Sequence, residues 1–532
     1  MTKLVRVAPW FAMLAACSPA TPGGNGAGGS TASGGAPAGT GGSPGEAGST
    51  GSGGTTGSGG ASGTGGATGT GGTTGTGGTT GTGGAAGAAA CAPPTIMPMP
   101  ATGADAIAGT LTQFNDNGAW TWYSDERAVV DVAGGKLIIS SDGNSMGAGG
   151  APRNGQVDAV IYDLAAKTFQ RTALGQLSPD DHNNAAILVR PDGKYVAMYA
   201  GHNQDCKSYY RNYDGTTWGA TATFDWVPLG CDLTVNTKVS YSNLWYMSAE
   251  SKVYSFVRSI GTSPNVLVST NNGQTFTYGG RLTSTVQVGY VAGYYKYWGN
   301  GVDRIDFVGT EAHPRDFDNS LYHGYLKGGK TYDSKDKMID ADIADATQPD
   351  ITVFTKLFAT GTNIHGVTLT HAWNIDLQRY DDGTIALIWK ARADTNADSP
   401  DHRLMYARYD GTSWKLTYLG KAGLKLYDSE QDYVGLGALH PNDPHTIYIS
   451  TTIDPRDDTT NLGKHEIFQG TTCDNGATFT WTPITARSTR DNLRPIVPAW
   501  DAGHTALLWF RGTYTTAQQY NAAVVGIIST RP

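Results

Sequence analysis

Seven short runs rich in β-branched and aromatic residues recur along the chain. They are KLIISSDG (136–143), KYVAMYAG (194–201), KVYSFVRS (252–259), RIDFVGTE (304–311), TIALIWKA (384–391), TIYISTTI (446–453) and TALLWFRG (505–512). Weaker strands and Asp-Gly, Asn-Gly or Gly-Gly turns separate them, without an amphipathic helix pattern. Four strands per unit, repeated seven times at roughly 60 residues, predict an all-β fold, a seven-bladed β-propeller. A parallel β-helix, the alternative, needs a shorter period.

Two kinds of turn recur between the weaker strands. YRNYDGTTW (210–218) and YARYDGTSW (406–414) are nearly identical, and residues 269–276 and 472–479 match the Asp-box pattern Ser/Thr-x-Asp/Asn-x-Gly-x-Thr-Phe. An Asp box is a device for turning the chain within a blade. We therefore expect a structural role for both, with no implication for chemistry.

The N-terminus has the features of a bacterial lipoprotein signal. Lys3 and Arg6 precede a short apolar run that ends in Leu-Ala-Ala-Cys, with Cys17 at the lipidation position. The run is too short to span a bilayer. We expect residues 1–17 to be a signal peptide and Cys17 to carry lipid. Ser18 favours a lipid anchor at the outer membrane or cell surface of a Gram-negative bacterium; a secreted or periplasmic protein is the alternative.

Residues 18–92 are almost entirely Gly, Ser, Thr, Ala and Pro, with a GTGGTT repeat over 69–84. This composition cannot offset the entropy of ordering, so it predicts a flexible tether. Residues 93–532 contain the apolar residues for a core and form the predicted propeller domain. The net charge of −8 argues against a nucleic-acid partner, and we expect a monomer.

Four cysteines remain after Cys17. Three pairings are open: Cys206 with Cys231 is the local choice, and Cys91 with Cys473 would join the start of the domain to its end. Four free buried thiols are the alternative.

His182 and His202 flank one predicted hairpin, SPDDHNNAAILVRPDGKYVAMYAGHN (178–203), and should therefore meet at one edge. In a propeller, the start of each first strand and the end of each second strand lie on the same face. The residues predicted at such positions are Arg127, His182, His202, Tyr241, Arg258, His313, Tyr433, Arg494 and Arg511. A ring of His, Tyr and Arg on one face is not expected from stability alone, because buried cations are costly unless paired.

Five short motifs occur in an order that resembles a known family. They are WTWYSDERA (120–128), DDHNN (180–184), GHN (201–203), HPR (313–315) and DNLRP (491–495). Together they resemble BNR-repeat propellers, which include ulvan lyases and related enzymes acting on rhamnose–uronate bonds. The similarity spans residues 118–526. Thr121 and Ala185 depart from the family pattern, which often has Cys and Pro there, so the polymer need not be ulvan.

The resemblance implies a lyase that removes the C5 proton of a uronate and breaks the bond at C4. In ulvan lyases two histidines, a tyrosine and an arginine have these roles. Carried onto this sequence, His182 is the expected base and Tyr241 is expected to donate a proton to the leaving oxygen. His202 is expected to orient the reacting groups or to share in the proton transfer. Arg258 is expected to neutralise the carboxylate with help from Asn265.

The remaining predicted roles concern substrate and metal. Arg127, Asn183, Asn265, Trp122, Arg494 and Arg511 are candidate substrate-binding residues. Trp120, Trp122 and Tyr123 form either a sugar-stacking platform or part of the core. His313 and His323 flank a loop where some relatives carry a structural metal, so zinc or calcium is a candidate there, although the chemistry requires no cofactor.

Three functions remain open from the sequence. The first is an exported, lipid-anchored lyase of an acidic rhamnose–glucuronate polysaccharide. The second is a glycoside hydrolase of the same fold, rhamnosidase-like, although no pair of catalytic carboxylates is evident. The third is a non-catalytic glycan-binding propeller. A sialidase is disfavoured, because its arginine triad and Tyr-Glu pair are not found.

Overall fold

The computed structural model describes residues 96–235, 238–394, 396 and 401–530. Cys17 and Cys91, the predicted signal peptide and the predicted tether lie outside these residues. Within the described residues, no helix has the length and apolar character to cross a membrane. Helical structure there is limited to the short 3-10 turns η1 (Ala151–Arg153), η2 (Val227–Leu229), η3 (Ile260–Thr262) and η4 (Ile351–Val353).

The first three blades are regular four-stranded antiparallel sheets. Blade 1 contains β3 (Ala128–Asp131), β4 (Lys136–Asp142), β5 (Gln156–Asp163) and β6 (Phe169–Gln176). Blade 2 contains β7 (Ala186–Val189), β8 (Tyr195–Tyr199), β9 (Lys207–Tyr213) and β10 (Ala222–Asp225). Blade 3 contains β11 (Ser240–Met247), β12 (Lys252–Arg258), β13 (Pro264–Ser269) and β14 (Thr277–Arg281).

Blade 4 is extended, and blades 5 and 6 return to the regular pattern. Blade 4 contains β15 (Tyr295–Gly299), β16 (Ile305–Gly309), β17 (Leu321–Lys327), β18 (Lys330–Asp333), β19 (Met338–Asp340) and β20 (Thr355–Phe358). Blade 5 contains β23 (Thr370–Arg379), β24 (Ile385–Arg392), β25 (His402–Tyr409) and β26 (Trp414–Gly423). Blade 6 contains β27 (Gly437–Leu439), β28 (Thr446–Ile453), β29 (Asn461–Thr471) and β30 (Thr480–Pro483).

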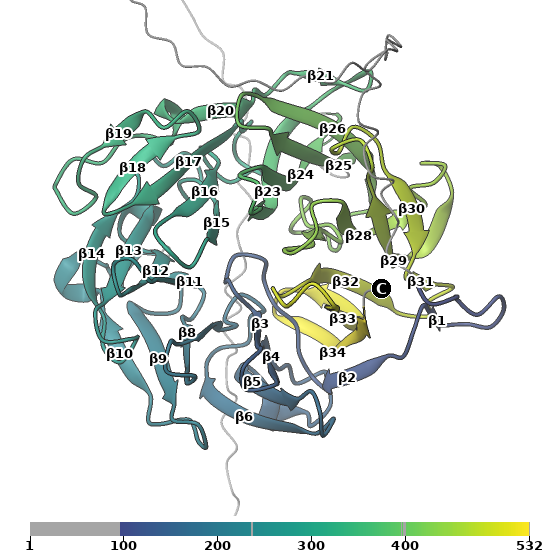
Figure 1. The fold of residues 1–532 in the computed structure, drawn as a ribbon, viewed down its shortest axis with the longest axis horizontal. Helices are drawn as coiled ribbons and strands as arrows, with labels where there is room; N and C mark the ends of the chain where they lie inside the picture. The colour runs from purple at the N-terminus through teal and green to yellow at the C-terminus, as the bar shows by residue number, and fades with distance from the viewer. Residues whose placement is uncertain (1–95, 236–237, 395, 397–400, 531–532) are drawn as a thin grey trace, which may run out of the picture. The chain divides into compact units, whose positions relative to one another are not determined.

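Blade 7 closes the ring with strands from both ends of the domain. Its order is β2 (Thr112–Asn115), β34 (Gln519–Thr530), β33 (His504–Thr516) and β32 (Asp491–Ile496). Two short pairs complete the strands: β1 (Ala106–Ile107) with β31 (Thr485–Ala486), and β21 (Asn363–Ile364) with β22 (Val367–Thr368). Figure 1 shows the seven blades around one axis, which confirms the predicted seven-bladed propeller.

Each of the seven predicted runs forms the second strand of its blade, namely β4, β8, β12, β16, β24, β28 and β33. These strands are buried between the neighbouring blades on both sides; all eight residues of β24 are buried. A strand covered on both faces has a continuous apolar sequence instead of an alternating one. This explains why the second strands give the clearest signal in the sequence.

The two Asp boxes have the structural role expected of them. Each lies between the third and fourth strands of its blade, in blades 3 and 6. In the first box the Ser269 hydroxyl accepts the Gly273 N–H at 2.8 Å, and Asn271 accepts the Thr275 N–H at 3.0 Å. Gly273 has a φ of +78°, which a glycine adopts without strain.

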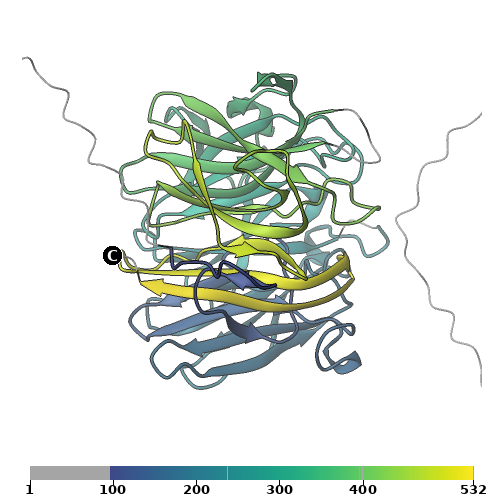
Figure 2. The ribbon, with the colours of Figure 1, turned by 90° about the vertical axis from the view of Figure 1, so that its right-hand side faces the viewer.

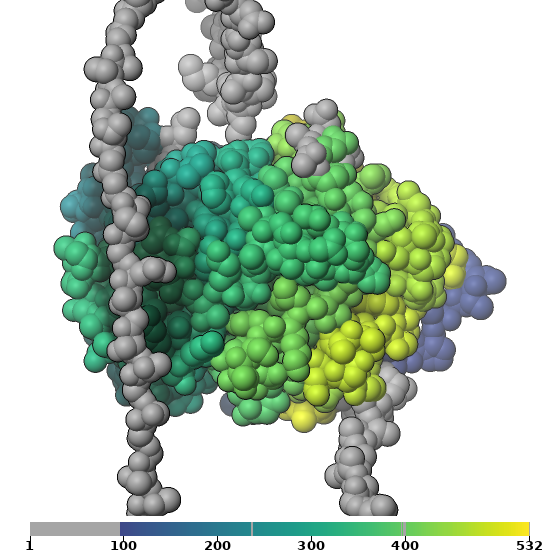
Figure 3. Space-filling model, turned by 90° about the horizontal axis from the view of Figure 1, so that it is seen from above, coloured from purple at the N-terminus to yellow at the C-terminus, as the bar shows by residue number. Residues whose placement is uncertain are grey.

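Strand β2 joins the first part of the domain to its last blade. It pairs with β34, and Phe114 from β2 is 1% exposed in a cluster with Leu508 and Tyr520. Figure 2 shows the last blade in yellow between the first blade in blue and the sixth in green. Figure 3 shows the first of the described residues in purple-blue against the yellow C-terminal strands on the surface. The ring is therefore closed by backbone pairing and apolar packing together.

We expect Phe114→Ala to destabilise the propeller by about 3–5 kcal/mol, because it removes a buried aromatic ring at the closure. The matched control is Phe169→Ala, which removes a ring that is 59% exposed and should change stability by less than about 0.5 kcal/mol. Denaturant unfolding of both variants measures the difference. Equal stability of the two variants would contradict the role assigned to β2.

Candidate active site

His182 and His202 meet on one face of the propeller, in the loops before β7 and after β8. Their rings are stacked with centroids 4.3 Å apart and planes 12° from parallel. The Asn183 side chain ties the two loops together, since it accepts the His202 backbone N–H at 2.8 Å and donates to the Ser178 carbonyl at 2.8 Å. Asn183 therefore positions the histidine pair instead of facing a substrate.

Both ring nitrogens of His182 have partners. Nδ1 lies 2.6 Å from an Asp180 oxygen and 2.7 Å from an Asp181 oxygen, and Nε2 lies 2.9 Å from the Tyr433 hydroxyl. Burial disfavours the charged ring, but the carboxylates of Asp181 and Asp180 outweigh it and raise the pKa of His182 to about 9. His182 is therefore a cation at neutral pH, with no nitrogen free to accept a proton.

Arg494 holds the carboxylate of Asp181 in place. It is 1% exposed, and its guanidinium donates to Asp181 at 2.5 Å and to the Trp120 carbonyl at 2.6 Å. The Tyr514 hydroxyl also donates to Asp181 at 2.5 Å. The buried guanidinium is held by the Asp181 carboxylate and the Trp120 carbonyl, so Arg494 supports the histidine pair instead of binding a substrate directly.

His202 has the opposite protonation state. Its Nδ1 lies 3.2 Å from the second oxygen of Asp180, and its Nε2 has no hydrogen-bond partner among the described residues. Burial, together with the positive charge of His182, lowers the pKa of His202 to about 4. With Nδ1–H donating to Asp180, the neutral ring holds a free lone pair on Nε2. His202 is thus equipped to accept a proton.

Tyr241 and Arg258 lie beside the histidines, because Ser240 at the start of β11 pairs with Arg258 at the end of β12. The Arg258 guanidinium is 4.7 Å from the centre of the Tyr241 ring, which is itself 5.9 Å from each histidine ring. Burial and the nearby Tyr294 raise the pKa of Tyr241 well above its usual value, so its hydroxyl stays protonated. Its φ of +66° is a strained conformation for a tyrosine, as is common at functional sites.

Arg258 is a buried cation without a carboxylate partner among the described residues. It is 6% exposed and donates to the Tyr294 hydroxyl at 3.2 Å and to the Ser240 hydroxyl at 3.1 Å. Hydroxyl groups and aromatic faces solvate the guanidinium but leave its charge uncompensated. An anionic ligand would supply the missing charge.

Tightly packed rings close the channel beneath these residues. We call this set the aromatic plug; it consists of Trp122, Tyr123, Tyr294, Trp373 and Tyr433. Trp122 is 2% exposed, and its indole N–H donates to the Asn374 carbonyl at 3.2 Å. The structure therefore places Trp122 in the core and leaves no ring face free for stacking on a sugar.

Three other predicted substrate-binding residues lie apart from the histidines. Arg127 lines a cavity at the opposite end of the channel. Arg511 pairs with Asp105 of the N-terminal segment. The Asn265 amide donates to the backbone carbonyls of residues 260 and 263, which holds the turn after Arg258. In a propeller, the start of each first strand and the end of each second strand lie on the same face. This relation places a residue at one end of its blade but does not say where its side chain points.

His313 and His323 do not form a joint metal site. His323 is bound to Ser334 at 2.7 Å and to Asp306 at 3.1 Å, whereas His313 lies 3.9 Å from Glu430 and packs on the plug. Neither belongs to the one group of potential ligands that converges among the described residues, which is Asp180, His182 and His202.

That group does not fit a metal bound by both histidines. A metal ion lies about 2.0–2.1 Å from a histidine nitrogen and in the plane of its ring. The two rings are nearly parallel with centroids 4.3 Å apart, so their planes do not meet near either nitrogen. Hydrogen bonds to Asp180 account for the convergence instead.

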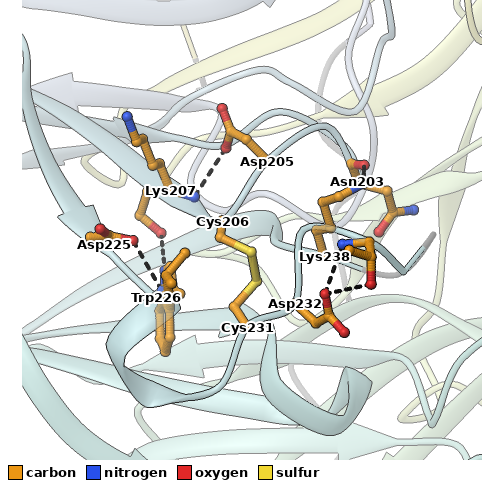
Figure 4. Close-up of a disulfide and its surroundings, with 12 residues drawn as sticks. Asn203, Asp205, Cys206, Lys207, Asp225, Trp226, Cys231, Asp232 and Lys238 are labelled. Carbon is orange, nitrogen blue, oxygen red and sulfur yellow. Dashed lines mark hydrogen bonds between the residues drawn. A yellow bond between two sulfur atoms is a disulfide. The ribbon is translucent and has the colours of Figure 1, made fainter.

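A disulfide fastens the loop that leads into Tyr241. Cys206 and Cys231 are bonded with sulfurs 2.04 Å apart, which confirms the local pairing. Cys473 is also disulfide-bonded, and Cys91, which we expect to be its partner, lies outside the described residues. Figure 4 shows the bond beside Asn203, whose backbone N–H donates to the Val239 carbonyl at 3.0 Å. The segment after His202 and the segment before Tyr241 are thus held together.

Sequence reasoning did not assign roles to Asp180, Asp181 or Glu430. The first two aspartates stand directly before His182 in the DDHNN motif, and that adjacency was the available signal. Glu430 lies in the loop before β27 and pairs with Arg315 at 2.7 Å. Nothing in the sequence around Glu430 indicates that it reaches a loop from blade 4.

Comparison with known proteins finds similarity in structure only. No protein-family profile and no curated protein sequence matches the chain. A polysaccharide lyase described as an ulvan lyase bound to -[GlcA(1-4)Rha3S]- aligns with a TM-score of 0.55 and 12% identity, over 78% of this chain and 95% of that one. A second structure of an ulvan lyase gives 0.54 at the same identity and the same coverage. The chain therefore shares the propeller fold of these lyases.

We expect loss of the disulfide to reduce stability by about 2–4 kcal/mol, because the bond restricts the unfolded chain. The Cys206→Ser/Cys231→Ser double variant tests this by denaturant unfolding. Treatment of the wild-type protein with a reductant should lower its stability by at least as much, because Cys473 is disulfide-bonded as well. Unchanged stability of the double variant would contradict this role.

Proposed function

We propose that the protein is a polysaccharide lyase that cleaves a uronate-containing polymer, of the rhamnose–glucuronate type, by β-elimination. The observation that carries the proposal is the neutral His202 with its unpartnered Nε2, placed beside Tyr241 and the uncompensated Arg258. These are a base, an acid and a carboxylate-binding cation, the three groups that the reaction requires.

In the proposed reaction Arg258 binds the uronate carboxylate through its fork of N–H donors. This interaction stabilises the negative charge that develops when the C5 proton leaves. His202 Nε2 takes that proton, the C4=C5 double bond forms, and the bond from C4 to the glycosidic oxygen breaks. The Tyr241 hydroxyl gives its proton to the departing oxygen. Solvent then takes the proton from His202 and restores that of Tyr241.

The assignment of the base differs from the expectation based on sequence. His182 was the expected base, but its two nitrogens are occupied and its pKa is raised to about 9. We assign it a positioning role: it holds Asp180 and, by its charge, keeps His202 neutral. His202 takes the role of the base.

Hydrolysis by paired carboxylates is less well supported. Burial raises the pKa of Glu430 to about 7; the positive charge of Arg315 lowers it, and the negative charge of Asp432 raises it further. A carboxyl group with such a pKa could act as the acid of a hydrolase. The carboxylates of Asp180 and Asp181, however, are bound to His182, His202 and Arg494. Neither is available as the second catalytic group.

The proposal includes export and a lipid anchor at Cys17, which rest on the N-terminal sequence alone. A flexible tether would then place a monomeric enzyme at a distance from the outer membrane, where an extracellular polymer could reach the site. No metal is required for the steps above.

The direct test is the ultraviolet absorbance of the unsaturated uronate while the protein is incubated with ulvan and related rhamnose–glucuronate polymers in the presence of EDTA. We expect a rise that falls by about 10²–10⁴-fold in His202→Ala, which removes the base. His445→Ala is the matched control, since that side chain is 45% exposed and belongs to a loop of the opposite face. Free rhamnose without absorbance would indicate a hydrolase, and binding without either product would indicate a glycan-binding protein.

The pH dependence should reflect the two histidines. Since the pKa of His202 is about 4 and that of His182 about 9, kcat/KM should rise through pH 4 and fall through pH 9. Asp181→Asn removes one carboxylate beside His182, so the upper limb should move to lower pH. A single limb near pH 6.5 in both proteins would contradict the assignment of charges.

A further inference from the structure

A cavity of about 660 Å³ lies at the end of the channel opposite the histidines. Its walls come from the ends of first strands and the turns that follow them, including residues 188–189, 298–299, 376–382, 439, 441–442, 444, 496–499 and 502. The volume is within the range of about 300–1,000 Å³ that is typical of small-molecule sites. Five of its lining residues carry the argument: Glu126, Arg127, Trp245, Trp298 and Asp376.

The cavity is separate from the histidine site. The rings of Trp122, Tyr123 and Trp373 from the aromatic plug lie between them and are each 1–2% exposed. Trp122 and Trp373 are in contact with ring centroids 5.1 Å apart. The channel is therefore closed in its middle, and the cavity is a blind pocket.

The charges at the inner end of the cavity are balanced within the protein. Asp125 pairs with Arg127 at 3.2 Å and with the buried ammonium of Lys296. Asp376 accepts the Leu439 backbone N–H at 2.8 Å. Arg379, the other arginine that lines the cavity, pairs with Asp306 at 2.8 Å. Among the described lining residues no unpaired cation therefore remains to attract an acidic sugar, and the buried cations Arg127 and Lys296 oppose a metal ion.

Glu126 adds a neutral hydrogen-bonding group. Its side chain has no hydrogen-bond partner among the described residues, and burial beside Asp125 and Asp376 raises its pKa to about 8. A protonated carboxyl both donates and accepts a hydrogen bond, as a sugar hydroxyl does. The Nε–H of Arg127 and the indole N–H of Trp245 also have no partner among the described residues.

The walls offer aromatic surface. Trp245 and Trp298 both line the cavity, at the ends of neighbouring first strands β11 and β15. Aromatic rings combined with a few polar groups that donate and accept are the lining that a hydroxyl-rich, uncharged ligand requires. A blind pocket admits the end of a chain or a short oligomer, not the middle of a polymer.

We propose that this cavity is a second carbohydrate site that binds a neutral sugar unit or the end of a short neutral oligosaccharide, independently of the histidine site. Glu126 hydrogen-bonds to the sugar hydroxyls, and the tryptophan walls cover its apolar faces. The proposal does not depend on the lyase activity, because none of the residues that form the cavity takes part in that reaction.

Isothermal titration calorimetry and saturation-transfer NMR with L-rhamnose, xylotetraose and cellotetraose test the proposal on the full chain. We expect at least one saccharide to bind, with affinity unchanged in His202→Ala. Glu126→Gln, which keeps a neutral group that donates and accepts, should retain affinity within about threefold, whereas Glu126→Leu should lose about tenfold or more. Thermal unfolding checks that both variants fold.

Three results would overturn the proposal. The first is that none of the three saccharides binds. The second is that binding disappears in His202→Ala, which would place the sugar in the histidine site. The third is that Glu126→Gln abolishes binding as completely as Glu126→Leu, which would mean that an ionised carboxylate is required. Calcium titrated in place of saccharide is expected to give no heat, and calcium binding lost in Glu126→Gln would indicate a cation site instead.

Discussion

The interaction on which the candidate site depends is the pair of buried carboxylates, Asp180 and Asp181, around the ring of His182. Asp181 is held by Arg494 at 2.5 Å, and Asp180 links His182 to His202. The charges alternate along this chain of contacts, from Arg494 to Asp181, His182 and Asp180. The last member, His202, receives no proton, because a second cation stacked on the first would repel it.

The propeller makes this arrangement possible by bringing distant parts of the chain to one axis. His182 and His202 belong to blade 2, Tyr241 and Arg258 to blade 3, Tyr433 to the loop before blade 6, and Arg494 and Tyr514 to blade 7. Closure of the ring by β2 fixes blade 7 against blade 1 and so holds Arg494 in place. The aromatic plug then divides the channel into two ends with different chemistry.

Much of the architecture could be predicted from the sequence, since the second strands are buried on both sides and have continuous apolar sequences. The hairpin also correctly indicated that His182 and His202 would meet. The protonation states could not be predicted, because they depend on Asp181 and Arg494, which come together only when the ring closes. Trp122, Arg127 and Arg511 show a second limit: the strand pattern gives a position along the blade but not the partner that each side chain finds. Asp105, the partner of Arg511, lies in a segment without any strong pattern.

The central claim is that, of the two stacked histidines, His182 carries a positive charge at neutral pH and His202 is neutral. NMR of the protein with ¹⁵N-labelled histidine rings measures this directly, with His182→Gln and His202→Gln to assign the signals. The account predicts that His182 is protonated on both nitrogens at neutral pH and loses a proton near pH 9, while His202 keeps a bare Nε2 down to about pH 4. A neutral His182, or titration of both rings near the ordinary histidine value of about 6.5, would contradict it.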